Sequence, residues 1–329
     1  MSYHIAMAYK IDKKRILILI ILLCVAVLII RGCVISGAEG IAFVPEGKTI
    51  SVFNEKTGRV IKMPLETYIK NVVAAEMPAA YDIEALKAQA VAARTFAVRR
   101  MKTYGGSSCK SNAEICTSSG CCQAYADEAA QRERWGGEYE TYSEKISRAV
   151  SETVGKVLFY DDEPIDALYH AVSGGETEDS AHVFSARPYL IGVESPGEED
   201  ASHYTDSLTF SREEFVRKIS AAIKGASLNK NKLEKEVLVT SRYESGRVKT
   251  VKLNNAECTG KEIRDALVLY SSNFSFEFSK KNVIITTIGY GHGVGMSQSG
   301  ANAMAKSGNT YEEILNHYYV GVEIKQIDE

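Results

Sequence analysis

Residues 65–100 read LETYIKNVVAAEMPAAYDIEALKAQAVAARTFAVRR, and this stretch decides the centre of the fold. Leu65, Ile69 and Val72 recur at the spacing of one helix face. Pro78 removes a backbone donor and ends that helix. An aspartate four residues later is a good N-cap, so the stretch predicts two consecutive helices, one on each side of the proline.

The next position on the apolar face of the first helix is a carboxylic acid, Glu76. Its pKa should be raised, because partial burial and the negative end of the helix dipole both disfavour the ionised form. An acid that stays protonated near neutral pH suits general-acid catalysis. The competing interpretation is that Glu76 turns outward or pairs with a nearby arginine such as Arg94.

The remainder of the domain mixes β-hairpins with capped helices and lacks the regular alternation of an α/β sheet. We therefore predict an α+β fold, with a ligand cleft, over residues 41–329. The expected hairpins cover 41–63, 156–170 and 237–253. Further helices are expected over about 139–154 and after the capping residues Ser211, Thr259, Ser297 and Thr310.

The N-terminal segment has the pattern of a membrane anchor. Four basic residues precede an uninterrupted apolar run, 16–30, which Arg31 closes. We predict a cytoplasmic segment over 1–15, a transmembrane helix over 16–35, and export of all that follows. The alternative is a cleaved signal peptide, with the small residues 36–38 as its cleavage site.

Composition narrows the class of protein. Hydrophobic residues make up 45% of the 329-residue chain and charged residues 25%, as in a globular protein. The formal net charge of -3 and the lack of a basic stripe argue against nucleic-acid binding.

Four of the seven cysteines fall within one short loop, at Cys109, Cys116, Cys121 and Cys122. The spacing is not that of a common zinc knuckle, and export to an oxidising compartment makes disulfides a fair alternative. Two disulfides would have to use the adjacent cysteines separately, whereas one zinc ion could gather all four thiolates. Such a metal would be structural, because no exchangeable ligand is evident.

Three stretches together resemble the stage II sporulation protein D family of membrane-anchored lytic transglycosylases. They are residues 65–100, YHAVSGGETEDSAHVF at 169–184, and GYGHGVGMSQSGANAMAKSG at 289–308. The resemblance implies that Glu76 is the catalytic residue. It would cleave peptidoglycan between N-acetylmuramic acid and N-acetylglucosamine, leaving a 1,6-anhydro end. Some family members carry zinc at the cysteine loop.

The resemblance also implies a setting. The domain would lie on the outer face of the cell membrane, in the intermembrane space of the sporangium. It would degrade septal wall during engulfment, on glycan stripped of stem peptides by the amidase stage II sporulation protein P. Stage II sporulation protein M is the other expected partner.

Several polar side chains could bind the glycan. Tyr68, Gln89 and Arg94 could hold the glycan or orient Glu76. Alternatively, Tyr68 could be a core aromatic and Arg94 a structural counter-ion. The glycine-rich loop, GYGHGVGMSQSG at 289–300, is expected to line the cleft, although its His292 could also pin the loop by a structural hydrogen bond. The full set of predicted substrate-binding residues is Tyr68, Gln89, Arg94, Ser173, Thr177, His292 and Gln298.

Two other functions remain open at this point. A related branch of the family enhances wall amidases, so the domain could bind glycan without cleaving it. A water-using muramidase would need a second carboxylate across the cleft, for which Glu176, Glu178 or Asp179 could be proposed.

Overall fold

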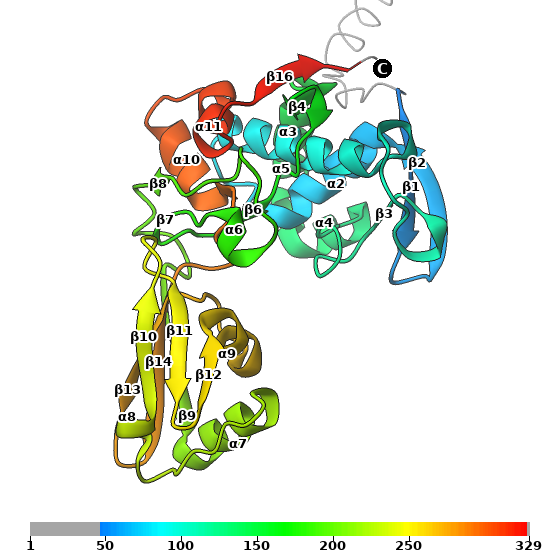
Figure 1. Ribbon diagram of the computed structural model, residues 1–329. Helices are drawn as coiled ribbons and strands as arrows, with labels where there is room; N and C mark the ends of the chain where they lie inside the picture. Colours follow the sequence, from blue (N-terminus) through cyan, green and yellow to red (C-terminus); the bar gives the residue numbers. More distant parts are fainter. Residues whose placement is uncertain (1–46, 328–329) are drawn as a thin grey trace, which may run out of the picture. The chain divides into compact units, whose positions relative to one another are not determined.

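The computed structural model describes residues 47–327. Within them no helix is both long and apolar enough to cross a membrane. The predicted cytoplasmic segment 1–15, the predicted anchor 16–35 and the first residues of the 41–63 hairpin lie outside the described residues. The described chain mixes helices with several small sheets (Figure 1), which confirms the predicted α+β class.

Helix α3 (Ile83–Arg100) is the central element of the larger of two lobes, the helical lobe, which comprises residues 47–204 and 289–327 (Figure 1). Thirteen of its 18 residues are buried, so it is covered on nearly every side. Six of those thirteen are alanines, whose small side chains let neighbouring helices approach closely. The neighbours are α2 (Leu65–Glu76), α5 (Tyr139–Ser151), α10 (Gln298–Lys306) and α11 (Tyr311–Tyr318).

A three-stranded sheet attaches the cysteine loop, residues 105–125, to this lobe. Strands β1 (Thr49–Asn54) and β2 (Arg59–Pro64) form the predicted hairpin, and β3 (Ile115–Cys116) pairs parallel to β1. The remaining elements of the lobe are α4 (Glu128–Trp135), β4 (Lys156–Tyr160), β5 (Glu163–Pro164), β6 (Tyr169–His170), β7 (Gly175–Glu176), α6 (Ser180–Val183), β8 (Glu194–Ser195), β15 (Met296–Ser297) and β16 (Glu323–Gln326).

Residues 205–288 form a second lobe, the inserted lobe, with a separate apolar core. Its strands are β9 (Thr205–Ser211), β10 (Val237–Arg242), β11 (Val248–Leu253), β12 (Ala256–Thr259), β13 (Phe274–Phe278) and β14 (Asn282–Ile288). They form two three-stranded antiparallel sheets, in the orders β10-β11-β12 and β13-β14-β9. Its helices are α7 (Arg212–Ala222), α8 (Leu233–Glu236) and α9 (Gly260–Leu267).

Arg247 of the inserted lobe is buried at the junction of the two lobes. Its Nη2 donates to the backbone oxygen of Ser173 at 2.8 Å, and its Nη1 donates to that of Glu176 at 3.0 Å. Gly293 lies against the guanidinium, where an added Cβ would come within 2.3 Å of the Arg247 Cζ. A glycine is therefore required there, both for that approach and for its φ of +85°.

Most predicted elements are confirmed, including the capping boxes at Thr259 and Thr310. Ser211 caps α7 without the reciprocal glutamate bond. Helix α4 was not predicted, and the 156–170 hairpin was predicted too long. Its return strand is only two residues, because Tyr169 and His170 leave it to pair in parallel with β15.

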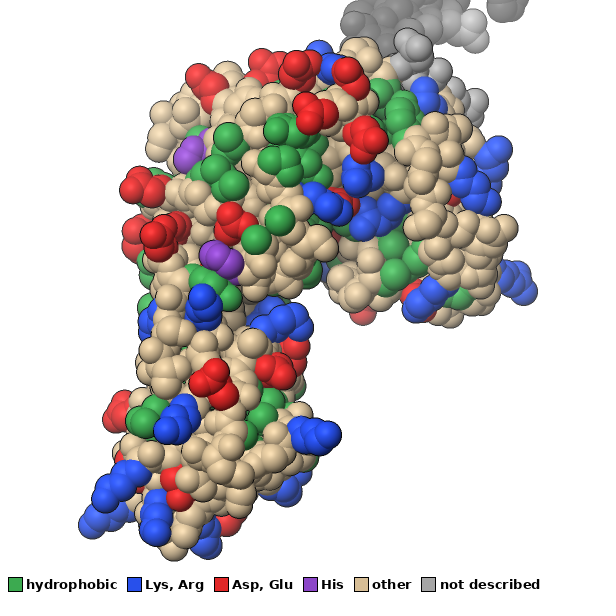
Figure 2. All heavy atoms as spheres, viewed as in Figure 1, with side chains coloured by type: hydrophobic (Ala, Val, Ile, Leu, Met, Phe, Trp, Pro, Cys, Tyr) green, Lys and Arg blue, Asp and Glu red, His purple; other side chains and the backbone are tan. Residues whose placement is uncertain are grey.

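Charged side chains of both signs are spread over the face drawn in Figure 2. Lys and Arg side chains gather at the end of the inserted lobe that carries α8. Exposed acidic residues include Glu194, Glu199 and Asp200, before the inserted lobe begins.

Candidate functional site

Glu76 is the last residue of α2 and reaches a pocket of about 480 Å³. Such a volume lies in the range of ligand-binding cavities. Three segments distant in sequence supply its walls: the cysteine loop, the β6 segment and the glycine-rich loop. The lining residues are Glu76, Phe96, Ser119, Cys122, Gln123, Ala167, Leu168, Tyr169, His170, Ala171, Arg264, Tyr290, Gly291, His292 and Gln298.

Burial raises the pKa of the Glu76 carboxyl, as the sequence predicts. Two hydrogen bonds oppose this effect, because they stabilise the ionised form. The Ala124 N–H donates to Oε1 at 2.5 Å, and the Tyr169 hydroxyl contributes the other. Glu76 therefore has a raised pKa, and its carboxyl is held in place by two hydrogen-bond donors.

Arg94 does not pair with Glu76. Its side chain is fully buried, and its Nε and Nη2 donate to the two carboxylate oxygens of Glu66 at 2.7 and 2.6 Å. Such a bidentate pair is a strong, geometrically specific contact. Arg94 is the structural counter-ion of Glu66, and the structure does not bring it to the pocket.

Two of the predicted contacts in the glycine-rich loop do line the pocket. The His292 Nδ1 accepts from the Val294 N–H at 3.1 Å, so this ring also pins its own loop. Burial, together with the nearby positive charges of Arg264 and Arg247, lowers the His292 pKa to about 4. The imidazole is therefore neutral at physiological pH.

Gln89 and Tyr68 lie behind the pocket wall. The Gln298 Nε2, in the lining, donates to the Gln89 Oε1 at 3.1 Å. The Tyr68 hydroxyl donates to the Gln123 Oε1 at 3.2 Å, and the Gln123 Nε2 donates to the Tyr169 hydroxyl at 2.8 Å. Tyr68 is fully buried, and this hydrogen-bonded chain links its hydroxyl to Tyr169 beside Glu76.

Ser173 and Thr177 are not in the lining. The Ser173 Oγ donates to Glu198 at 2.9 Å, and Thr177 exchanges side-chain and backbone hydrogen bonds with Val193. Each is only 1% exposed. Both hold the shape of the loop between β6 and β8, where sequence reasoning expects a sugar-binding rim.

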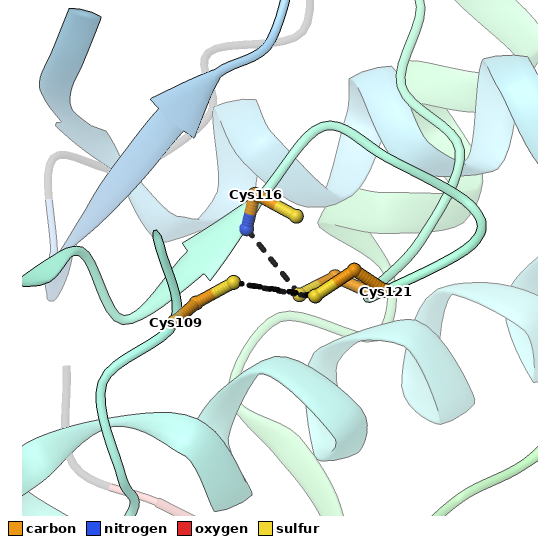
Figure 3. Close-up of side chains that lie close together, drawn as sticks. Cys109, Cys116 and Cys121 are labelled. Carbon is orange, nitrogen blue, oxygen red and sulfur yellow. Dashed lines mark hydrogen bonds between the residues drawn. The ribbon is translucent and has the colours of Figure 1, made fainter. Parts of the chain in front are cut away.

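The four loop cysteines converge (Figure 3). Their sulfur atoms all lie within 4.8 Å of one another, and the described cysteines are free thiols. The Cys109 Sγ lies 3.4 Å from that of Cys121 and 3.6 Å from that of Cys122, and the adjacent pair is 3.8 Å apart.

These separations fit a tetrahedral zinc site. Thiolates at about 2.3 Å from a central zinc ion would lie about 3.8 Å from one another. Burial raises the pKa of the Cys116 thiol to about 11 and also raises that of Cys122. A bound cation would be needed to hold these sulfurs as thiolates at neutral pH.

The stage II sporulation protein family model matches residues 53–160, a range that includes Glu76 and all four loop cysteines. Stage II sporulation protein D of Bacillus subtilis is 38% identical over 293 residues, which cover 89% of this chain and 82% of that protein. The chain belongs to the stage II sporulation protein D family.

Two further relatives are informative. Stage II sporulation protein D of Bacillus amyloliquefaciens is 37% identical, over 85% of this chain and 79% of its own length. A Bacillus subtilis protein named amidase enhancer is 27% identical over 78% of this chain, but only 40% of its own length is covered. The chain is therefore similar both to sporulation proteins and to a protein named for amidase enhancement.

The lining residues that sequence reasoning missed include Tyr169, His170 and Arg264. The first two lie in the stretch that carries the resemblance, where the pairing of β6 with β15 was the missing information. The His170 Nδ1 donates to the Val294 oxygen at 3.2 Å. Arg264 comes from α9, and no local pattern connects that helix to the pocket.

Proposed function

We propose that this member of the sporulation family is a peptidoglycan lytic transglycosylase. It cleaves the bond from N-acetylmuramic acid to N-acetylglucosamine and leaves a 1,6-anhydro end. The observation that carries the proposal is the setting of Glu76: a half-buried carboxyl of raised pKa, oriented by two hydrogen-bond donors, in a cavity large enough for sugar rings.

Glu76 acts first as an acid and then as a base. The protonated carboxyl gives its proton to the glycosidic oxygen as the bond from that oxygen to C1 breaks. The resulting carboxylate takes the proton of the muramic 6-hydroxyl as that oxygen bonds to C1. The ring closes, the leaving sugar departs with a free hydroxyl, and Glu76 is again protonated. The raised pKa serves the first step and the Ala124 and Tyr169 donors stabilise the ion formed between the steps.

The pocket favours this chemistry over hydrolysis by water. An inverting or retaining hydrolase needs a second carboxylate across the cleft. Within the described residues, Glu76 is the one carboxylic acid of the pocket lining. Glu178 is 3% exposed and is engaged by Ser245 and His182, and neither Glu176 nor Asp179 is in the lining.

The cellular setting belongs to the same proposal. The segment over 16–35 anchors the protein in the cell membrane, and the domain faces the intermembrane space, where it degrades septal wall during engulfment. Its substrate is glycan already stripped of stem peptides. That preference implies cooperation with a peptide-removing amidase, stage II sporulation protein P, and assembly with stage II sporulation protein M.

We also propose that the four loop cysteines hold one structural zinc ion. The convergence of four sulfurs within one short loop supports it. Zinc would fix the loop that supplies the Ala124 N–H and the Cys122 side of the pocket wall. The metal takes no part in proton transfer, which Glu76 carries out alone.

A second function is favoured by the relative named amidase enhancer. In that case the same pocket would bind glycan, stimulate an amidase and cleave nothing. The two proposals differ in their dependence on the acid: amidase stimulation would not require a proton on residue 76.

The test is mass spectrometry of glycan released from amidase-treated walls by the full chain. We expect anhydro-muramic ends from the parent and at least a thousandfold lower rate from Glu76→Gln, which keeps the shape and removes the proton. Glu138→Gln is the matched control, since it makes the same substitution at an exposed position of the same lobe, outside the pocket. Release of anhydro ends by Glu76→Gln at the parent rate would contradict the assignment. Absence of cleavage by the parent, with amidase stimulation by both proteins, would favour the second function.

A further inference from the structure

The pocket lining includes one side chain that carries positive charge at physiological pH, Arg264 of α9. The two histidines of the lining are neutral there, because burial and neighbouring arginines lower their pKa values. Arg264 is therefore the one cationic side chain among the described residues that line the pocket, with Arg247 lying behind the wall. Any ligand held beside Glu76 meets this charge.

The guanidinium of Arg264 is positioned but not neutralised. Its Nε donates to the Leu269 backbone oxygen at 3.2 Å. Among residues 47–327, Nη1 and Nη2 have no hydrogen-bond or ion-pair partner. The acid next to it in sequence, Asp265, is paired with Lys261 at 2.6 Å. Two parallel donors thus remain for a ligand, the geometry that suits a carboxylate.

The backbone after α9 holds this arginine in an uncommon way. Val268, the residue that ends the helix, has φ +56° and ψ +49°, a conformation that β-branched residues rarely adopt. It turns the chain so that Leu269 both donates to the Arg264 carbonyl at 2.9 Å and accepts from its Nε. Backbone strain of this kind tends to be kept where it positions a functional group.

An exposed aromatic ring stands in the same lining as Arg264. Tyr290 is 39% exposed and packs edge to face on Tyr270, with ring centroids 4.9 Å apart. An aromatic face of this kind suits the apolar face of a sugar ring. The Arg264 guanidinium in the same lining, with Nη1 and Nη2 available as donors, suits a sugar that bears an anionic group.

We propose that Arg264 binds the lactyl carboxylate of a muramic acid residue in the glycan strand. This inference rests on the proposed function and explains its substrate class. In a strand stripped of stem peptides every muramic acid bears a free lactyl carboxylate, whereas a stem peptide converts that group to an uncharged amide. A bidentate contact from Nη1 and Nη2 would therefore select stripped strands directly, through charge and not only through the smaller size of the substrate.

The test compares three glycans with the full chain: stripped strands, the same strands with their carboxylates methyl-esterified, and strands with stem peptides. For the parent we expect kcat/KM on esterified strands to be about 10- to 100-fold below that on stripped strands, the effect of losing a charge-assisted pair. Arg264→Gln should lose the same factor on stripped strands and stay within about twofold of the parent on esterified ones. Arg264→Lys, which keeps the charge without the fork, should recover part of the loss.

Arg217→Gln is the matched control, since it removes an exposed arginine of α7 in the same lobe. It should leave all three rates unchanged. Equal losses for Arg264→Gln on stripped and esterified strands would overturn the proposal and make Arg264 a packing residue. Indifference of the parent to esterification would overturn it as well.

A binding measurement separates this proposal from the proposed function. Fluorescence anisotropy of labelled strands with the full-length Glu76→Gln chain reports recognition without cleavage. If the parent yields no anhydro ends but Glu76→Gln binds stripped strands about 10-fold or more tightly than esterified ones, the catalytic assignment fails and the Arg264 site stands. Equal affinity of Glu76→Gln for stripped and esterified strands would overturn the Arg264 proposal, whether or not the parent cleaves glycan.

Discussion

Tyr169→Phe removes one of the two donors that face the Glu76 carboxylate and leaves the Ala124 N–H in place. A hydrogen bond to an ionised carboxylate stabilises the charged form, so its loss raises the pKa of Glu76 further. In free enzyme the protonated carboxyl is the active form, and the alkaline limb of kcat/KM follows its pKa. That limb should therefore move to higher pH.

The size of the effect follows from the contact removed. A hydrogen bond to a charged group contributes about 1.5–3 kcal/mol, and each pH unit corresponds to about 1.4 kcal/mol. Part of the loss is recovered by rearrangement, so we expect a displacement of about one pH unit. The rate at the optimum should fall about tenfold, because the ion formed between the two steps is less stabilised. The measurement is initial rates on stripped glycan between pH 4 and pH 9, a range wide enough to show both limbs.

Tyr68→Phe is the matched control. It removes a hydroxyl from the other end of the same Gln123 side chain, at 3.2 Å, without removing a donor to Glu76. It should leave the alkaline limb in place and lower stability by about 1 kcal/mol. An equal displacement in both variants would refute the reasoning, because the change would then come from Gln123. A displacement to lower pH in Tyr169→Phe would refute it outright.

Three other predictions concern the stability of the site and its metal content. Glu76→Gln should raise the free energy of unfolding at neutral pH, because burial makes the ionised carboxyl unfavourable in the folded state and so raises its pKa. The gain should be absent below the unfolded-state pKa of about 4.3, grow as the pH rises toward the raised folded-state pKa, and level off above it, as thermal melts at several pH values would show. Gly293→Ala should lower the free energy of unfolding by about 2–4 kcal/mol, because the added Cβ would overlap the buried Arg247 guanidinium and because φ is positive at this residue. Denaturant titration measures this loss, and a change below about 0.5 kcal/mol would contradict the expectation. Protein purified without chelator should contain one zinc per chain by elemental analysis, and chelation should increase hydrogen exchange in residues 105–125 before the rest. Zinc should be lost more readily at acid pH, because the thiols must be deprotonated to bind it. Substoichiometric zinc with four oxidised thiols would decide for disulfides.

The elements that sequence predicts well are those whose signals are local. Helices α2 and α3 follow from apolar spacing, Pro78 and the Asp82 cap, which accepts from the Glu84 N–H as expected. The raised pKa of Glu76 also follows from local reasoning, since burial at the end of an amphipathic helix is visible in the spacing.

The residues that sequence misjudges depend on contacts between distant segments. Arg94 is excluded from the pocket by Glu66, 28 residues away, and Ser173 by Glu198, 25 residues away. Arg264 enters the lining from a lobe with its own core, more than 180 residues after Glu76 in the sequence. Neither hydrophobic periodicity nor capping residues can predict such contacts, because contacts between distant segments leave no pattern in the local sequence.

The cysteine loop and the catalytic acid belong to one unit, and this follows from how Ala124 is held. A backbone N–H can keep a 2.5 Å contact with Glu76 only if its own loop is restrained. That loop is fixed at three points: β3 pairs with β1, the cysteine sulfurs converge, and Gln123 bonds Tyr68 and Tyr169. Loss of the sulfur cluster would free the chain immediately before Gln123 and so loosen a donor to the acid. The metal proposed for the cluster would therefore affect the pKa of Glu76 and the rate through the backbone alone, without touching the substrate.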